Sequence, residues 1–134
     1  MLAFGALAVA ACGSTSKGAT APRPPAPVNL AVYIDDSRVS VSPAIVSAGP
    51  VAFVITNQAS QAQSLAVLAS GRAAGQPLAN TGPIGPRATA QVTVDFSSPG
   101  RYSLAAAGGG GAIRAAWIVV GKPRASSDNL LMQP

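Results

Sequence analysis

The chain has 134 residues, enough for one domain, with nine basic and four acidic side chains, no histidine and one cysteine. These counts exclude a Ser–His–Asp triad and any imidazole-bearing zinc or copper site, and they leave few groups for other acid–base chemistry, so we expect no enzyme. The net charge of +5 is scattered along the chain. Because no basic run is interleaved with aromatics, we also expect no nucleic-acid partner.

The first segment, residues 2–11, is an apolar run that is too short to cross a bilayer as a helix, which takes about 20 residues. Its length is typical of the hydrophobic region of a signal peptide. The run ends in Val9-Ala10-Ala11, directly before Cys12, and small residues before a cysteine resemble a bacterial lipobox. No basic residue precedes the run in the sequence as given.

The lipobox resemblance implies a role for each of its residues. Val9, Ala10 and Ala11 would form the recognition triplet at the end of a signal peptide spanning residues 1–11. Cys12 would receive the diacylglyceryl group and become the first residue of the mature chain. The alternative interpretation of Cys12 is a buried structural cysteine.

Residues 12–27 continue from this cysteine into a stretch rich in Gly, Ser, Thr, Pro and Ala that has no apolar periodicity. Such a composition is typical of a tether, which could extend to about 50 Å at most. We therefore expect a domain that is lipid-anchored at the extracytoplasmic face of the cell membrane. Its partners would be the membrane, through the lipid, and an envelope protein or polymer.

The folded part is expected over residues 28–121, where short apolar runs alternate with turn residues. No helical period is sustained there, so the pattern predicts an all-β sandwich of seven to eight strands. Turns are predicted at Asp35-Asp36-Ser37, at Ala48-Gly49-Pro50 and at residues 97–100. The expected strands are 28–34, 38–42, an edge segment at 44–47, 51–57, 63–69, 88–96, 101–106 and 113–120.

The remaining segments are predicted to connect strands or to form the end of the chain. Residues 70–87 carry several Gly and Pro residues and indicate an irregular connection, and the glycines at 108–111 indicate a loop between strands. Residues 122–134 are expected to form a disordered tail. Tyr102 and Trp117 are expected in the core, because a sandwich with so few aromatics needs them for volume.

The order of these features resembles the cupredoxins, the plastocyanin-like Greek-key β-sandwiches. The matching stretches are 47–57 (SAGPVAFVITN), 64–67 (SLAV), 98–102 (SPGRY) and 118–120 (IVV). In that family, a loop after the first of these strands carries a histidine copper ligand, and the Pro-Gly-x-Tyr turn leads towards a cysteine ligand, a second histidine and an axial methionine.

The resemblance places each copper ligand on a residue that cannot serve as one. The first histidine falls at Gln63, the cysteine at Ala106, the second histidine near Gly109 and the methionine near Arg114. A blue-copper site needs two imidazoles and a thiolate. We therefore expect a sandwich that has lost its copper site and carries no cofactor.

Two further groups of residues have both a structural and a functional interpretation. Asp35 and Asp36 form a turn or bind a hard cation such as calcium, which prefers six to eight oxygen ligands. Gln63 and Arg114 are solvated at a loop rim or line a small polar pocket.

The favoured interpretation is a binding or structural lipoprotein of the cell envelope with no catalytic activity. The alternative is a copper-handling accessory protein of the periplasm or outer-membrane-facing surface, with other ligands such as Met132.

Overall fold

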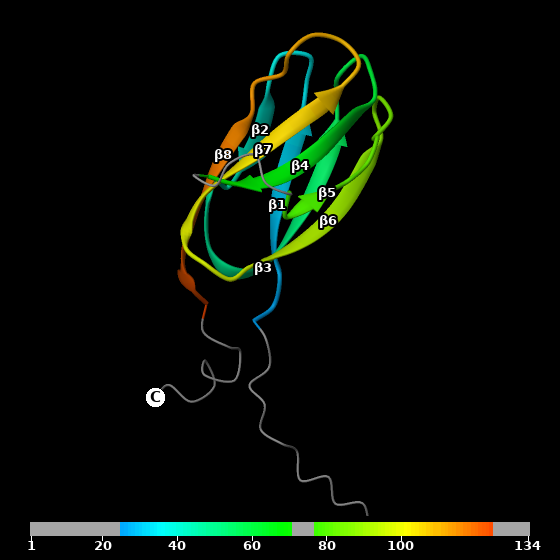
Figure 1. The fold of residues 1–134 in the computed structure, drawn as a ribbon. Coiled ribbons are helices and arrows are strands. Elements are labelled where there is room, and N and C mark those ends of the chain that lie inside the picture. Colours follow the sequence, from blue (N-terminus) through cyan, green and yellow to red (C-terminus); the bar gives the residue numbers. More distant parts are fainter. Residues whose placement is uncertain (1–24, 71–76, 125–134) are drawn as a thin grey trace, which may run out of the picture.

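The computed structural model describes residues 25–70 and 77–124, which form an all-β sandwich as the sequence pattern predicts (Figure 1). The predictions for Val9 to Cys12, for most of the tether and for the tail after Arg124 lie outside these residues. No helix among the described residues is long and apolar enough to cross a membrane. The strands are β1 (Val28–Ile34), β2 (Val39–Ser42), β3 (Ile45–Asn57), β4 (Gln63–Ala69), β5 (Ala79–Asn80), β6 (Thr89–Phe96), β7 (Gly100–Gly108) and β8 (Ala116–Pro123).

Two sheets share strand β3. The first sheet has the order β2-β1-β3-β6, and the second has the order β3-β8-β7-β4-β5. The pairings of β3 with β1 and with β8 are parallel, and the others are antiparallel. Two of these strands, β1 and β8, are close to the two ends of the described domain.

Strand β3 passes from one sheet to the other at the position predicted as a turn. Residues 45–48 pair with β8 at the edge of the second sheet, and residues 49–56 pair with β6 in the first. The turn predicted at Ala48-Gly49-Pro50 is therefore wrong, because the strand bends there without reversing. The bend requires Gly49, whose φ of +131° is rarely adopted by residues with a side chain.

The core lies between the sheets and follows the predicted alternation. Val51, Phe53 and Ile55 are fully buried on the inner face of β3. The ring of Phe96 lies edge-on to Phe53, with centroids 6.1 Å apart, and tilted against Tyr102 at 4.6 Å. Tyr102 is buried as expected, and its hydroxyl donates a 2.7 Å hydrogen bond to the carbonyl of Ser98. These contacts tie together three strands from the two sheets.

Trp117 does not lie in the core, so the expectation from the sequence is wrong for this residue. Its side chain is 47% exposed, whereas the next residue, Ile118, is fully buried. Strand β8 has apolar residues on both faces, and the smaller pair, Ile118 and Val120, points inward. The exposed indole lies beneath the guanidinium of Arg101, whose Cζ is 4.8 Å from the ring centroid.

Several strands differ in extent from the predicted ones, and one strand was not predicted. A two-residue strand, β5, forms within the stretch expected to be irregular, β7 continues to Gly108, and β8 continues to Pro123, beyond the expected domain end at Gly121. The chain ends of the described domain leave at one pole of the sandwich, and the loops 35–38, 57–63 and 109–115 lie at the other (Figure 1). We call these the terminal pole and the loop pole.

Candidate functional site at the loop pole

The β1–β2 turn at the loop pole is organised by two carboxylates. Asp35 Oδ1 accepts hydrogen bonds from the backbone N–H of Ser37 at 2.8 Å, the Ser37 hydroxyl at 2.9 Å and the Arg38 N–H at 2.7 Å. These bonds, first of all the one from the Ser37 N–H, hold the pKa of Asp35 below its ordinary value. The predicted turn is therefore confirmed, with the Asx geometry expected of an aspartate at its start.

Asp36 connects this turn to the loop between β3 and β4. Its Oδ1 accepts hydrogen bonds from the N–H of Ser60 at 2.9 Å and from the Ser60 hydroxyl at 2.8 Å. Among the described residues, no cluster of three or more side chains of the types His, Cys, Asp and Glu can hold a metal ion. The calcium alternative therefore has no support from these residues.

Asn57, at the end of β3, holds the loop that leads to Gln63. Its side chain is fully buried. The amide nitrogen donates to the carbonyls of Gln61 at 2.9 Å and Ile84 at 2.8 Å, and the amide oxygen accepts the Ala59 N–H at 2.9 Å. The bonds to Ile84 and Ala59 are buried, and the bond to Gln61 is partly buried, so the side chain of Asn57 fixes the local structure of this loop.

Gln63, at the position of the first histidine, is turned into the sandwich rather than towards solvent. It is only 2% exposed. Its Nε2 donates a 2.8 Å hydrogen bond to the carbonyl of Gly109, and its backbone exchanges two hydrogen bonds with Ile84. Its Oε1 is buried and has no hydrogen-bond partner. The amide thus joins the loop after β3 to the loop after β7.

The glycine loop fits closely around this glutamine. A Cβ on Gly108 would collide with the carbonyl oxygen of Ala62 and would approach Gln63 Oε1 to 2.7 Å. A Cβ on Gly109 would meet the side-chain oxygen of Gln61 at 2.6 Å. At Gly108 the absence of a side chain is a packing requirement, because the obstructing atom is a backbone oxygen. At Gly109 the exposed side chain of Gln61 would have to move aside.

Ala106 and Arg114 are placed differently from Gln63 and Gly109. Ala106 is half-buried on β7 and pairs with Leu65. Arg114 is exposed, and its backbone exchanges hydrogen bonds with Ser37 and Val39. The structure therefore brings Gln63 and Gly109 into direct contact. It gives no support to the polar pocket of Gln63 and Arg114, because one side chain is buried and the other is exposed.

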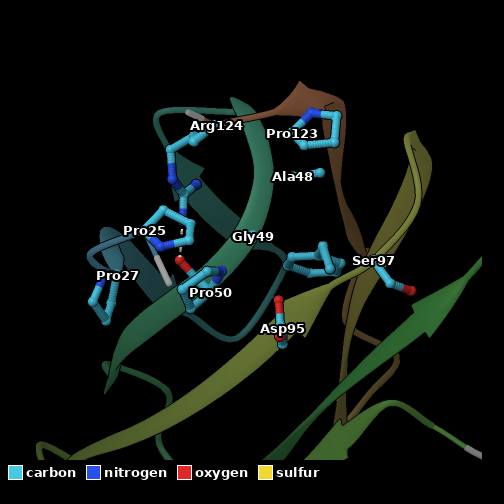
Figure 2. Close-up of a pocket in the computed structure, with 10 residues that line it drawn as sticks. Pro25, Pro27, Ala48, Gly49, Pro50, Asp95, Ser97, Pro123 and Arg124 are labelled. Carbon is cyan, nitrogen blue, oxygen red and sulfur yellow. Dashed lines mark hydrogen bonds between the residues drawn. The ribbon is translucent and has the colours of Figure 1, made fainter. Parts of the chain in front are cut away.

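One feature at the terminal pole was not predicted from the sequence. Arg124 donates to the carbonyls of Ser47 at 2.9 Å, Pro50 and Ala26, so it fastens the incoming chain to the bend of β3. Figure 2 shows this guanidinium beside a concave pocket of about 480 Å³. Four of the ten lining residues are prolines, and no motif in the sequence indicates the pocket. The lining residues are Pro25, Pro27, Ala48, Gly49, Pro50, Asp95, Phe96, Ser97, Pro123 and Arg124.

Comparison with solved structures identifies proteins of similar fold. The chain is similar to an auracyanin from the photosynthetic bacterium Roseiflexus castenholzii, with a TM-score of 0.53 and 15% identity over 72% of this chain and 98% of that one. It is also similar to auracyanin A, a blue copper protein from Chloroflexus aurantiacus, with a TM-score of 0.51 and 16% identity over 69% and 99% of the two chains.

A copper-containing nitrite reductase from Thermus scotoductus matches with a TM-score of 0.50 and 16% identity, over 81% of this chain and 31% of that one. No protein-family profile and no curated protein sequence matches the chain. The structural likenesses show that the fold is cupredoxin-like.

A blue-copper centre of the kind this fold can hold does not fit the residues of the loop pole. Such a centre needs two imidazoles and a thiolate in a trigonal arrangement. At the four positions that the sequence resemblance assigns to the ligands, the chain has a carboxamide that is already bonded to a backbone carbonyl, a methyl group, a glycine and an exposed guanidinium. The guanidinium would also bring positive charge towards a cation.

Proposed function

We propose that the protein is a membrane-anchored lipoprotein whose cupredoxin-like domain stands on the extracytoplasmic face and has a binding or structural role without copper and without catalysis. The observation that carries the proposed copper-free role is the buried side chain of Gln63. Its amide bonds to Gly109, so a residue that the sequence resemblance assigns to a metal ligand makes a contact between two segments of the loop pole instead. A pole closed in this way supports a scaffold function rather than electron transfer.

The anchoring part of the proposal is supported by the order of segments in the sequence. An apolar run ends in Val9-Ala10-Ala11 before Cys12, and a Pro- and Ser-rich stretch follows before the first strand. Two or more acyl chains on this cysteine would hold the domain at the membrane, since each buried methylene contributes about 0.8 kcal/mol.

Metabolic labelling with a palmitate analogue tests the anchor. We expect label in the wild-type protein and none in the Cys12→Ala variant, because the chain has no other cysteine that could carry a thioether or thioester. Fractionation of both strains provides the second readout, with the wild type in the membrane fraction. Equal labelling of the two proteins would contradict the lipoprotein proposal.

A titration of the full-length Cys12→Ala variant with Cu(II), Cu(I) and Ag(I) tests the copper-free role. We expect no stoichiometric binding, because the remaining soft side chains are two methionines. Tight binding by the Cys12→Ala variant would instead favour a metal-handling accessory protein.

A further inference from the structure

An apolar face lies on the outside of the second sheet, away from both poles' loops. Ile45 is 73% exposed, Trp117 47% and Val119 43%. Ile45 and Val119 are paired across β3 and β8, and Val119 is paired with Arg101 across β8 and β7. Directly paired residues point to the same side of a sheet, so these side chains adjoin. We call Ile45, Arg101, Trp117 and Val119 the Trp117 face.

The charge on the Trp117 face is positive. The guanidinium of Arg101 is stacked on the indole of Trp117, 4.8 Å from its centroid, which keeps the cation on the apolar surface. The carboxylates of the described residues lie elsewhere, with Asp35 and Asp36 at the loop pole and Asp95 on β6 of the other sheet. The face therefore complements a surface that is both apolar and negatively charged.

The outer face of the first sheet has a different character. Strand β6 presents exposed Thr89, Gln91, Thr93 and Asp95 there, and the large exposed side chains are Tyr33 and Val54, at 44% and 37%. A sandwich without a partner has no need for a tryptophan and an isoleucine on one outer face and hydroxyl and amide groups on the other. The asymmetry indicates that the Trp117 face is the one that is covered.

We propose that the Trp117 face docks on an anionic lipid surface. This inference rests on the proposed membrane anchor, because residues 13–24 would separate Cys12 from Pro25 and extend to about 40 Å at most. A tether of this length gives the face an effective concentration in the millimolar range at the membrane, so a small patch suffices. Tryptophan and arginine are the residues suited to the headgroup region. A second copy is the less favoured occupant, since it would bring another Arg101 to the same positive face.

Tryptophan fluorescence of the full-length Cys12→Ala variant tests this docking without the lipid anchor. Trp117 is the only tryptophan of the chain, so its emission reports on this face alone. We expect a blue shift with vesicles of phosphatidylglycerol and phosphatidylcholine and none with phosphatidylcholine alone. The shift decreases at high salt, because the Debye length falls to about 3 Å at 1 M.

Substitutions on the two outer faces provide matched variants in the same background. Arg101→Gln is expected to weaken vesicle binding about fivefold, the effect of removing one basic residue near an anionic surface. Ile45→Ser is expected to weaken it by a similar factor. The control variants Tyr33→Ser and Val54→Thr on the first sheet are expected to bind as tightly as the parent. Far-ultraviolet circular dichroism of each variant verifies the fold.

Three results would overturn the inference. Co-sedimentation with unchanged Trp117 emission would assign the binding to residues 2–11. A blue shift that depends on protein concentration without vesicles would assign the face to a second copy. Absence of vesicle binding would refute lipid docking and favour a protein partner. None of these results bears on acylation of Cys12, which the labelling experiment decides separately.

Discussion

Gln63 and Gly108 define how the loop pole is packed at the scale of single residues. Gln63 presents its amide nitrogen to Gly109 and leaves a buried oxygen without a donor. Gly108 lies where any side chain would run into Ala62. Position 63 therefore limits the charge of a substituted side chain, and position 108 limits its volume.

A carboxylate at position 63 tests the limit on charge. Gln63→Glu is isosteric, but its second oxygen replaces the amide donor, and burial without donors raises the pKa of a carboxyl group. A raised pKa means that the variant loses stability as pH increases from about 4, the ordinary value for glutamate, to 7. Urea unfolding at pH 4 and pH 7 checks this, with the wild type as reference. A variant as stable as the wild type at both pH values would show that donors reach Gln63 Oε1.

Alanine at position 108 tests the limit on volume. Gly108→Ala is expected to lower the free energy of unfolding by about 1–3 kcal/mol, because the obstructing atom is a backbone oxygen that cannot rotate away. Gly111→Ala is the matched control, since a Cβ there meets nothing within 4 Å. Chemical denaturation of both variants measures the difference. Equal midpoints would show that the loop shifts to accept the methyl group.

At the scale of elements, the β1–β2 turn depends on the ionised form of Asp35. The carboxylate accepts two backbone N–H groups and a hydroxyl, and these bonds lower its pKa. A lowered pKa contributes stability that is present above the ordinary value of 3.8 and is lost as pH falls below it. The turn joins two strands that form one edge of the first sheet.

The substitution Asp35→Asn isolates this contribution. The variant retains an oxygen acceptor but lacks the charge, so we expect it to be less stable than the wild type at pH 7 and to approach it at pH 3. Asp95→Asn removes one negative charge from β6 and serves as the control. Urea unfolding at the two pH values gives the comparison. A stability difference between Asp35→Asn and wild type that does not change with pH would contradict the role of the anion.

Local patterns in the sequence predict most strands, because the inward residues of β1, β3, β4 and β7 alternate with smaller or polar ones. The alternation fails for β8, where Trp117 and Val119 are as apolar as Ile118 and Val120, so the pattern cannot tell the inner face from the outer. It also fails at Gly49, since a Gly-Pro pair is compatible with a turn or with a bend in one strand.

The geometry of the candidate site was not predictable from the sequence. The motif order places Gln63 and Gly109 where metal ligands would lie in a cupredoxin-like fold, and the structure brings the two residues together. Nothing local in the sequence indicates that the amide is buried, because its burial depends on Ile84 and Gly108 from distant segments. Arg124 was unpredictable for the same reason, since its acceptors lie 74 to 98 residues away in sequence.

At the scale of the whole molecule, Arg124 connects both ends of the domain to the strand shared by the sheets. Arg124→Ala removes the bonds to Ser47, Pro50 and Ala26 and is expected to lower the free energy of unfolding by about 2 kcal/mol. Lys122→Ala, at an exposed position near the end of β8, is the control for a lost positive charge. Thermal and urea unfolding measure both variants. Equal stability of the two would show that water replaces the guanidinium at these carbonyls.

The position of β8 determines when this domain can fold. It is the last of the described strands in sequence, yet it lies between β3 and β7 in the interior of the second sheet. A nascent chain that ends before residue 116 therefore lacks the strand that joins β7, β4 and β5 to β3, so the second sheet cannot close over Phe53 and Leu104. The sandwich therefore closes only after residues 116–123 have been synthesised.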